Sequence, residues 1–216
     1  MSTRLTLSIV IVLIAAFFVV GVTVWNVMPE QMASHWNASD QVDDTMSKFW
    51  GIFLMPIMAS GMFLLFLVIP TIDPLKANIA QFREAFNLFI VFIMLFFGYV
   101  WGLSLIWNLG YTSFRMSTAM LPAMGLLFMY VGYMLRKAKR NFFIGIRTPW
   151  TLSSDRVWDE THRIGSILFM ASGVLAIIGA FFGGMTAFWL MFVPLIGSAV
   201  FTVVYSYVLY QRETKS

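Results

Sequence analysis

The sequence predicts an all-α membrane protein, folded as a bundle of six transmembrane helices. Its composition is the first observation behind this prediction, because 60% of the 216 residues are hydrophobic and only 11% are charged. Soluble domains carry about 25% charged residues, and a soluble core of this size does not hide so much apolar surface. Most of the chain is therefore expected to face lipid.

Six apolar runs are the second observation, and none of them contains a charged residue or a histidine. A helix rises about 1.5 Å per residue, so about 20 residues cross the hydrocarbon core of a bilayer. Helices are expected because lipid offers no partner for open backbone groups. The first run exceeds a signal-peptide core in length and no small-residue cleavage site follows it, so we expect an uncleaved anchor. The runs cover residues 5–25, 49–70, 85–108, 118–135, 164–182 and 187–210.

The distribution of basic residues is the third observation. Twelve of the fourteen Lys and Arg residues fall on the side of the N-terminus, and the two exceptions are Lys48 and Arg115. Basic residues favour the cytoplasmic side of a membrane. We therefore predict a multi-pass protein of the cell (plasma) membrane with an N-in/C-in topology, in which both termini are cytoplasmic.

The chain is expected to divide into two parts. Residues 1–84 form an N-terminal two-span hairpin with an acidic outer loop, and residues 85–216 form a four-span region with a basic cytoplasmic loop over residues 136–163. This charge asymmetry predicts attraction of cations outside and of anionic lipid or acidic partners inside. It is equally explained as the topology signal alone, and both interpretations stay open.

The outer loop places His35, Trp36 and Asn37 just before a cluster of carboxylates. We interpret this stretch as a binding surface for a peptide or a cation, with Trp36 as an aromatic anchor. The alternatives are an ordinary solvated loop and a metal site. The metal candidates have no recognised ligand spacing, so neither a metal nor another cofactor is expected; they are His35, Asp40, Asp43 and Asp44.

The stretch "NFFIGIRTPW", residues 141–150, is too apolar for a flexible linker. Gly145 permits a turn, and Pro149 pushes Thr148 toward an extended conformation. Arg147 lies beside aromatic residues, where it can snorkel, stack on a ring or bind a partner's carboxylate.

The following "SSDRVWDETHR", residues 153–163, reads as the start of a helix with Ser153 or Ser154 as its N-cap. Helical spacing places Trp158 and His162 on one face, and it predicts two i,i+4 ion pairs. We therefore expect residues 141–163 to form an amphipathic elbow in the cytoplasmic loop between spans four and five, lying on the inner membrane surface. The predicted ion pairs are Arg156–Glu160 and Asp159–Arg163.

Two motifs resemble the SdpI family, the sporulation-delaying-protein immunity proteins. "MPEQMASHWNASDQVDDTMSK", residues 28–48, resembles the Pro…His-Trp/Phe-Asn…Gly-x-x-Asp…Ser-Lys pattern of the small membrane domain in the N-terminal half of that family, although Asp40 stands where the pattern has glycine. The residues that match are Pro29, His35, Asn37, Asp43, Ser47 and Lys48.

The second motif, "RNFFIGIRTPWTLSSDRVWDETHR", is similar to the C-terminal pattern of the same family, and the likeness extends over nearly the whole chain together with the spans. The residues that match are Asn141, Ile144, Gly145, Arg147, Thr148, Pro149, Trp150, Ser153, Val157 and Trp158.

The resemblance implies an integral membrane immunity protein that gives resistance to a secreted, membrane-active peptide toxin. It also implies a toxin-responsive receptor that captures a cytosolic transcriptional repressor, as in the best-known case. The expected partners are the lipid bilayer, the toxin and the repressor, without direct binding to nucleic acid. The expected toxin-binding residues are His35, Trp36, Asn37, Asp43 and Lys48, and the expected cytoplasmic functional loop has Asn141, Gly145, Arg147, Thr148, Pro149, Trp150 and Trp158.

Two other classes of protein are alternatives to an immunity protein. A transporter or channel for small molecules or lipids stays possible, but proton coupling is disfavoured because the spans hold no ionisable residue. Enzyme activity is not expected, because the spans have no paired carboxylates, no HExxH motif occurs, and the two histidines are predicted on opposite sides of the membrane.

Overall fold

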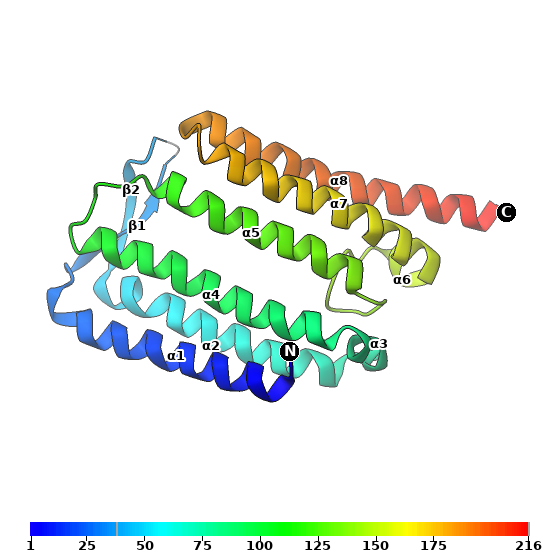
Figure 1. Cartoon of the computed structure of the whole chain (residues 1–216), viewed down its shortest axis with the longest axis horizontal. Coiled ribbons are helices and arrows are strands. Elements are labelled where there is room, and N and C mark those ends of the chain that lie inside the picture. The colour runs from blue at the N-terminus through cyan, green and yellow to red at the C-terminus, as the bar shows by residue number, and fades with distance from the viewer. Residues whose placement is uncertain (38, 216) are drawn as a thin grey trace.

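The computed structural model describes residues 1–37 and 39–215, and six helices within these residues are long and apolar enough to cross a membrane (Figure 1). The prediction of an all-α membrane bundle is thereby confirmed. The fifth predicted run extends slightly too far, because a turn follows Gly179. The first span continues through the short 3-10 helix η1 (Trp25–Val27). The six helices are α1 (Thr3–Val24), α2 (Lys48–Ile72), α4 (Arg83–Asn108), α5 (Met116–Lys137), α7 (Asp155–Gly179) and α8 (Gly184–Lys215).

The long helices form two groups, with α1, α2 and α4 in the first and α5, α7 and α8 in the second (Figure 1). Helices α4 and α5 lie side by side where the groups meet. There the Tyr130 hydroxyl donates to the carbonyl oxygen of Ala85 at 2.9 Å, and its ring stacks on Phe92 with the centroids 5.3 Å apart. The division of the chain at residue 84 stays a prediction.

Helices α5 and α7 approach closely because glycines face each other across their contact. A Cβ atom on Gly125 would lie 2.6 Å from the carbonyl oxygen of Gly173. Small residues allow such close approach in membranes, where van der Waals packing rather than the hydrophobic effect holds helices together. Helix α7 is also joined to α8 by a hydrogen bond between the hydroxyls of Ser172 and Ser198, which are 3.1 Å apart.

Large apolar side chains cover the outside of the bundle. Val12 is 67% exposed, Val19 62% and Ile11 59%. Such a surface is unfavourable in water and favourable in hydrocarbon, so the chain is a multi-pass membrane protein.

The two ends of the bundle carry different structures (Figure 1). At the hairpin end, strands β1 (Gln31–Trp36) and β2 (Val42–Ser47) pair antiparallel, a feature that the all-α prediction did not include. At the elbow end lie α3 (Lys76–Gln81), α6 (Pro149–Ser153) and both chain termini. The N-cap of α7 is Ser154, whose Oγ accepts from the Val157 N–H at 3.2 Å, as expected.

Candidate functional site

The β-hairpin is closed by a turn that depends on two polar side chains. Asn37 accepts hydrogen bonds from the backbone N–H groups of Ser39 at 2.9 Å and Gln41 at 3.0 Å. Asp40 has φ of +60°, in the left-handed region that favours glycine. Its carboxylate accepts from the N–H of Ser117 at 2.8 Å and from the Ser117 hydroxyl at 2.7 Å. The tight turn therefore forms with Asp40 in place of glycine, and the aspartate adds a link to α5.

A second link between the hairpin and the helices was not predicted from the sequence. The side-chain amide of Asn108, at the end of α4, donates to the carbonyl oxygen of Ala33 at 3.1 Å and accepts from the Ala33 N–H at 2.7 Å. A side-chain amide bonded in this way takes the place of one peptide group of a neighbouring strand, because it offers the same donor and acceptor. Asn108 thus covers the free edge of β1 at Ala33.

The predicted toxin-binding residues separate into two sets in the structure. His35 and Asp43 face each other across the hairpin with Nδ1 and Oδ1 2.5 Å apart, and both side chains are partly exposed. Lys48 lies at the base of the hairpin, where its ammonium group is 2.6 Å from Glu30 and 5.5 Å from the ring centre of Trp25. The Lys48 side chain is 12% exposed. We interpret Lys48 as a residue that anchors the hairpin.

A cavity of about 540 Å³ lies between the hairpin and the helices of both groups. His35, Trp36 and Asn37 contribute to its wall, so the structure brings these three predicted residues together. The Nε1–H of Trp36 is buried and has no hydrogen-bond partner among the described residues. Its ring packs edge-on against Trp107 at 5.6 Å. Six methionines also line the cavity: Met46, Met55, Met116, Met120, Met124 and Met191.

At the elbow end, Asn141 organises the loop from a fully buried position. Its Nδ2 group donates to the carbonyl oxygens of Lys139 and Ile144, each at 2.8 Å. Its Oδ1 atom accepts from the N–H groups of Phe143 at 2.9 Å and Ile144 at 2.6 Å. All donors and two acceptor positions of this amide are used, so the side chain holds a tight turn that regular secondary structure does not supply.

Gly145 and His162 fit together directly after this turn. Gly145 has φ of +116°, and a Cβ atom there would collide with Nε2 of His162. His162 accepts the N–H of Ile146 at 3.0 Å, and its Nδ1 lies 2.8 Å from the carbonyl oxygen of Trp158. A neutral ring with its proton on Nδ1 satisfies both contacts. The ring also stacks on Trp158 at 3.9 Å, which confirms that these two residues share a face of the helix.

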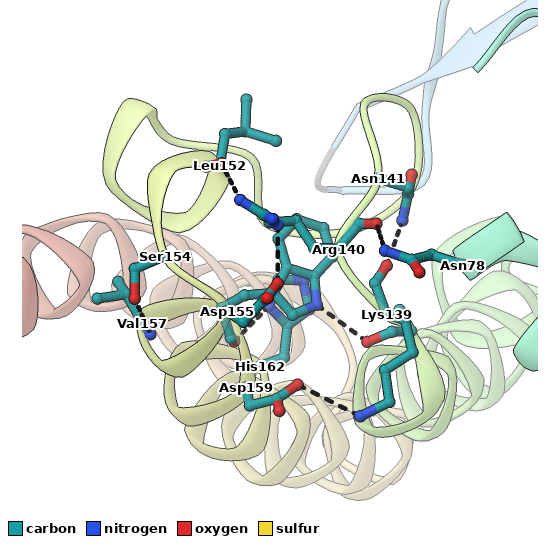
Figure 2. A network of polar contacts seen from close by, with 12 residues as sticks. Asn78, Lys139, Arg140, Asn141, Leu152, Ser154, Asp155, Val157, Asp159 and His162 are labelled. Atoms are coloured by element: carbon teal, nitrogen blue, oxygen red, sulfur yellow. Dashed lines mark hydrogen bonds and ion pairs between the residues drawn. The ribbon is translucent and has the colours of Figure 1, made fainter. Parts of the chain in front are cut away.

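Charged residues tie the elbow to α7 (Figure 2). Arg140 lies 2.8 Å from Asp155 and donates to the carbonyl oxygen of Leu152 at 2.9 Å. Asp159 lies 3.6 Å from Lys139. The two predicted i,i+4 ion pairs are therefore wrong, because the loop brings Lys139 to Asp159 and Arg163 pairs with Glu160 at 2.7 Å.

The remaining predicted residues of the elbow have mainly structural contacts. Thr148 and Thr151 form a capping box at the start of α6, with Pro149 at its first helical position. Trp150 packs on Tyr207 of α8 at 5.0 Å. Arg147 is exposed and donates to the carbonyl oxygen of Phe142 at 2.8 Å. Arg147 is thus the predicted residue with a charge available to a partner.

The segment between α2 and α4 also contacts the elbow, which the sequence did not suggest. Asp73 is 2% exposed and accepts the N–H of Phe142 at 2.9 Å. Figure 2 shows the second contact, in which Asn78 donates to the carbonyl oxygen of Arg140 at 2.8 Å. These contacts join the first helix group to the loop of the second. The only signal in the sequence was a carboxylate directly after an apolar run, which is common at span ends.

Within the residues that the structure describes, no group of three or more His, Cys, Asp or Glu side chains is placed to hold a metal ion. Of the four metal candidates considered in the sequence, His35 and Asp43 contact each other, and Asp40 binds Ser117. Asp44 accepts the N–H of Thr45 at 2.8 Å.

Comparison with known proteins gives two family matches on this chain. Residues 137–206 match the SdpI/YfhL protein family, and residues 12–59 match a domain of unknown function, DUF1648. The chain is also 25% identical over 203 residues to the Immunity protein SdpI of Bacillus subtilis (strain 168), covering 94% of each chain. Over these residues the chain is similar to the SdpI family. No solved structure matches it.

The two family matches cover different parts of the bundle. The DUF1648 match contains the hairpin, and the SdpI match contains the elbow with α7 and most of α8. The Asn108 link, the Ser117 link and the α4 and α5 walls of the cavity lie between the two matches. Neither motif in the sequence therefore pointed to them.

Proposed function

We propose that this chain is an immunity protein of the cell membrane that protects its host from a secreted, membrane-active peptide toxin. The observation that carries the proposal is the similarity to the Immunity protein SdpI over 94% of both chains, which includes both motif regions. The similarity concerns a binding and protection function, and we propose no catalytic activity and no cofactor.

In this proposal, the toxin meets the hairpin end, around His35, Trp36, Asn37 and Asp43. These residues combine exposed polar groups with aromatic surface beside a cavity. Tryptophan is enriched among residues that dominate binding energies, because it buries a large area and still offers a hydrogen-bond donor.

The same proposal places the elbow end in the cytoplasm. The segments at that end of the bundle carry twelve of the fourteen Lys and Arg residues, and the positive-inside rule favours an N-in/C-in topology. The chain has no cysteine, so single Ser39→Cys and Ser153→Cys variants give a clean test. An impermeant thiol reagent added to intact cells is expected to label position 39 and not position 153. Labelling of both from outside contradicts the topology.

The decisive experiment expresses the chain in cells that are sensitive to the sporulation-delaying peptide toxin. Survival is expected to rise with the wild-type chain and to fall back with Trp36→Ala, since an aromatic anchor contributes about 2 kcal/mol or more to binding. Trp189→Ala is the matched control, because Trp189 is 54% exposed on α8 and lies outside the cavity. Unchanged sensitivity with normal amounts of wild-type protein in the membrane contradicts the immunity function.

A signalling role is the second part of the proposal. The exposed guanidinium of Arg147, on a loop held by the hydrogen bonds of Asn141, is a suitable contact for an acidic surface of a cytosolic repressor. Toxin binding changes this surface only if the toxin prefers one of two bundle states. Arg147→Ala is expected to keep protection and to abolish toxin-dependent recruitment of a repressor to membranes. Arg136→Ala, at another exposed arginine of the same end, is the control.

The transporter alternative predicts a different result in purified form. Protein reconstituted in liposomes is expected to move no small molecule or lipid between leaflets beyond the rate of empty liposomes. Robust movement of a substrate favours the transporter.

A further inference from the structure

The cavity at the hairpin end has properties that identify the kind of ligand it takes. We propose that it binds the apolar segment of a peptide, with the cationic or neutral flank of that peptide at the hairpin. This rests on the proposed immunity function and names the place and the chemistry of toxin binding.

The first argument is size and lining. A volume of about 540 Å³ is typical of ligand sites, which range over roughly 300–1,000 Å³. Most of the lining is apolar, and methionines form a large part of it. Methionine has a flexible, polarisable side chain that adapts to differently shaped partners, as at surfaces that bind varied apolar peptide segments.

The second argument is an unused hydrogen-bond donor. Trp36 lines the cavity, and its buried Nε1–H has no acceptor among the described residues. A buried donor without a partner costs roughly 1–3 kcal/mol. A peptide brings carbonyl oxygens that can satisfy this donor, whereas a hydrocarbon chain does not. Polar groups of Ser34 and Asn37 lie along the same part of the wall.

The third argument is charge. The segments at the hairpin end carry four carboxylates, on Glu30, Asp40, Asp43 and Asp44, and two basic side chains, Lys48 and Arg115. This excess of negative charge repels the phosphate of a lipid headgroup and attracts a cationic peptide. The unused donor calls for an occupant with an acceptor group, and the acidic surface favours a cationic peptide over an anionic phospholipid.

The cavity also lies between the two helix groups. Its wall includes Trp50 and Trp101 from the first group and Met124 and Phe188 from the second. An occupant therefore contacts both groups at once, which is the arrangement that a ligand needs in order to favour one packing of the groups over another.

The test uses a photo-crosslinking amino acid at position 124 or 126 of the full chain, reconstituted in phosphatidylethanolamine–phosphatidylglycerol vesicles. Met124 lines the cavity, whereas Leu126 lies on the same helix and is 50% exposed on the outside of the bundle. The probe is the biotinylated sporulation-delaying peptide. We expect about tenfold more crosslinked peptide at position 124 than at 126, as for an occupied site against a lipid-facing one.

Equal crosslinking at the two positions, or lipid as the product at position 124, overturns the proposal. Cells can still be protected in that case, and the immunity function then stands without this site. If crosslinking is selective but cells are not protected, the cavity binds the peptide and the immunity function fails.

Filling the cavity gives a second, independent measurement. Ser104→Trp places a large ring at a small residue of the wall, and Leu126→Trp is the control outside it. Provided that both variants unfold at the same midpoint as the wild type, we expect Ser104→Trp to bind the peptide at least about tenfold more weakly and Leu126→Trp to bind it as the wild type does. If Ser104→Trp does not fold, Met124→Phe replaces it. Wild-type binding by a folded cavity-filling variant overturns the proposal.

Discussion

The two ends of this bundle order the polar segments outside the hydrocarbon by different kinds of contact. At the elbow end, the buried amide of Asn141 and the fit between Gly145 and His162 tie the loop to itself and to α7. At the hairpin end, backbone pairing orders the chain, and the side chains of Asn108 and Asp40 provide its polar links to α4 and α5.

This difference matters because the hairpin end borders a cavity of about 540 Å³, whereas the cavity beside Arg156 and Arg212 at the elbow end has about 270 Å³. A segment held by few links opens at lower free energy than one held by a dense network. This contrast agrees with our proposal that the hairpin end admits the toxin and that the elbow end keeps one shape for a cytosolic partner.

The largest expected effect is at the elbow end. Gly145→Ala forces a non-glycine residue to φ of +116° and drives its Cβ against His162, so we expect a loss of about 3 kcal/mol in the free energy of unfolding. Denaturant unfolding in detergent micelles measures it. Gly197→Ala, a helical glycine with open space around it, is expected to be slightly stabilising. If the two substitutions change the free energy of unfolding by similar amounts, the fit between Gly145 and His162 does not hold the elbow rigid.

A smaller effect is expected where the hairpin meets α4. Asn108→Leu keeps the approximate size of the side chain and removes both hydrogen bonds to Ala33, at a cost of about 1–2 kcal/mol in local stability. Hydrogen exchange of residues 31–47 is expected to speed up, while exchange at residues 141–153 is unchanged. Asn78→Leu, which removes the bond to Arg140, is expected to show the reverse pattern. If hydrogen exchange becomes faster at both ends in either variant, the two ends are not ordered independently of each other.

The smallest effect is expected at the turn of the hairpin. Ser117→Ala removes the hydroxyl bond to Asp40 and keeps the backbone bond, so a loss of about 0.5–1 kcal/mol is expected. Faster hydrogen exchange at residues 39–41 measures it. Ser113→Ala is the control, because the Ser113 hydroxyl makes no hydrogen bond with the described residues. Unchanged or slower exchange in Ser117→Ala contradicts a role for the Ser117 hydroxyl bond to Asp40 in holding the turn on α5.

Much of the architecture was predictable because the bilayer imposes simple rules on a chain. Length and apolarity alone identify six spans, since each must satisfy its own backbone hydrogen bonds in lipid. The elbow was predictable in part, because Gly145, Pro149 and Ser154 act on backbone angles and caps within a few residues of themselves. The strands were missed, since β1 and β2 carry no clear alternation of apolar and polar residues.

By itself, the sequence determined the membrane setting, the number of spans and the local turns, because hydrophobicity and backbone preference are properties of short segments. The tertiary structure decided which distant residues meet: Asn108 with Ala33, Ser117 with Asp40, and Asp73 with the elbow. Each of these contacts joins residues about 70 or more positions apart and depends on how the helix groups pack. The cavity arises in the same way, because its walls come from segments that no single stretch of sequence brings together.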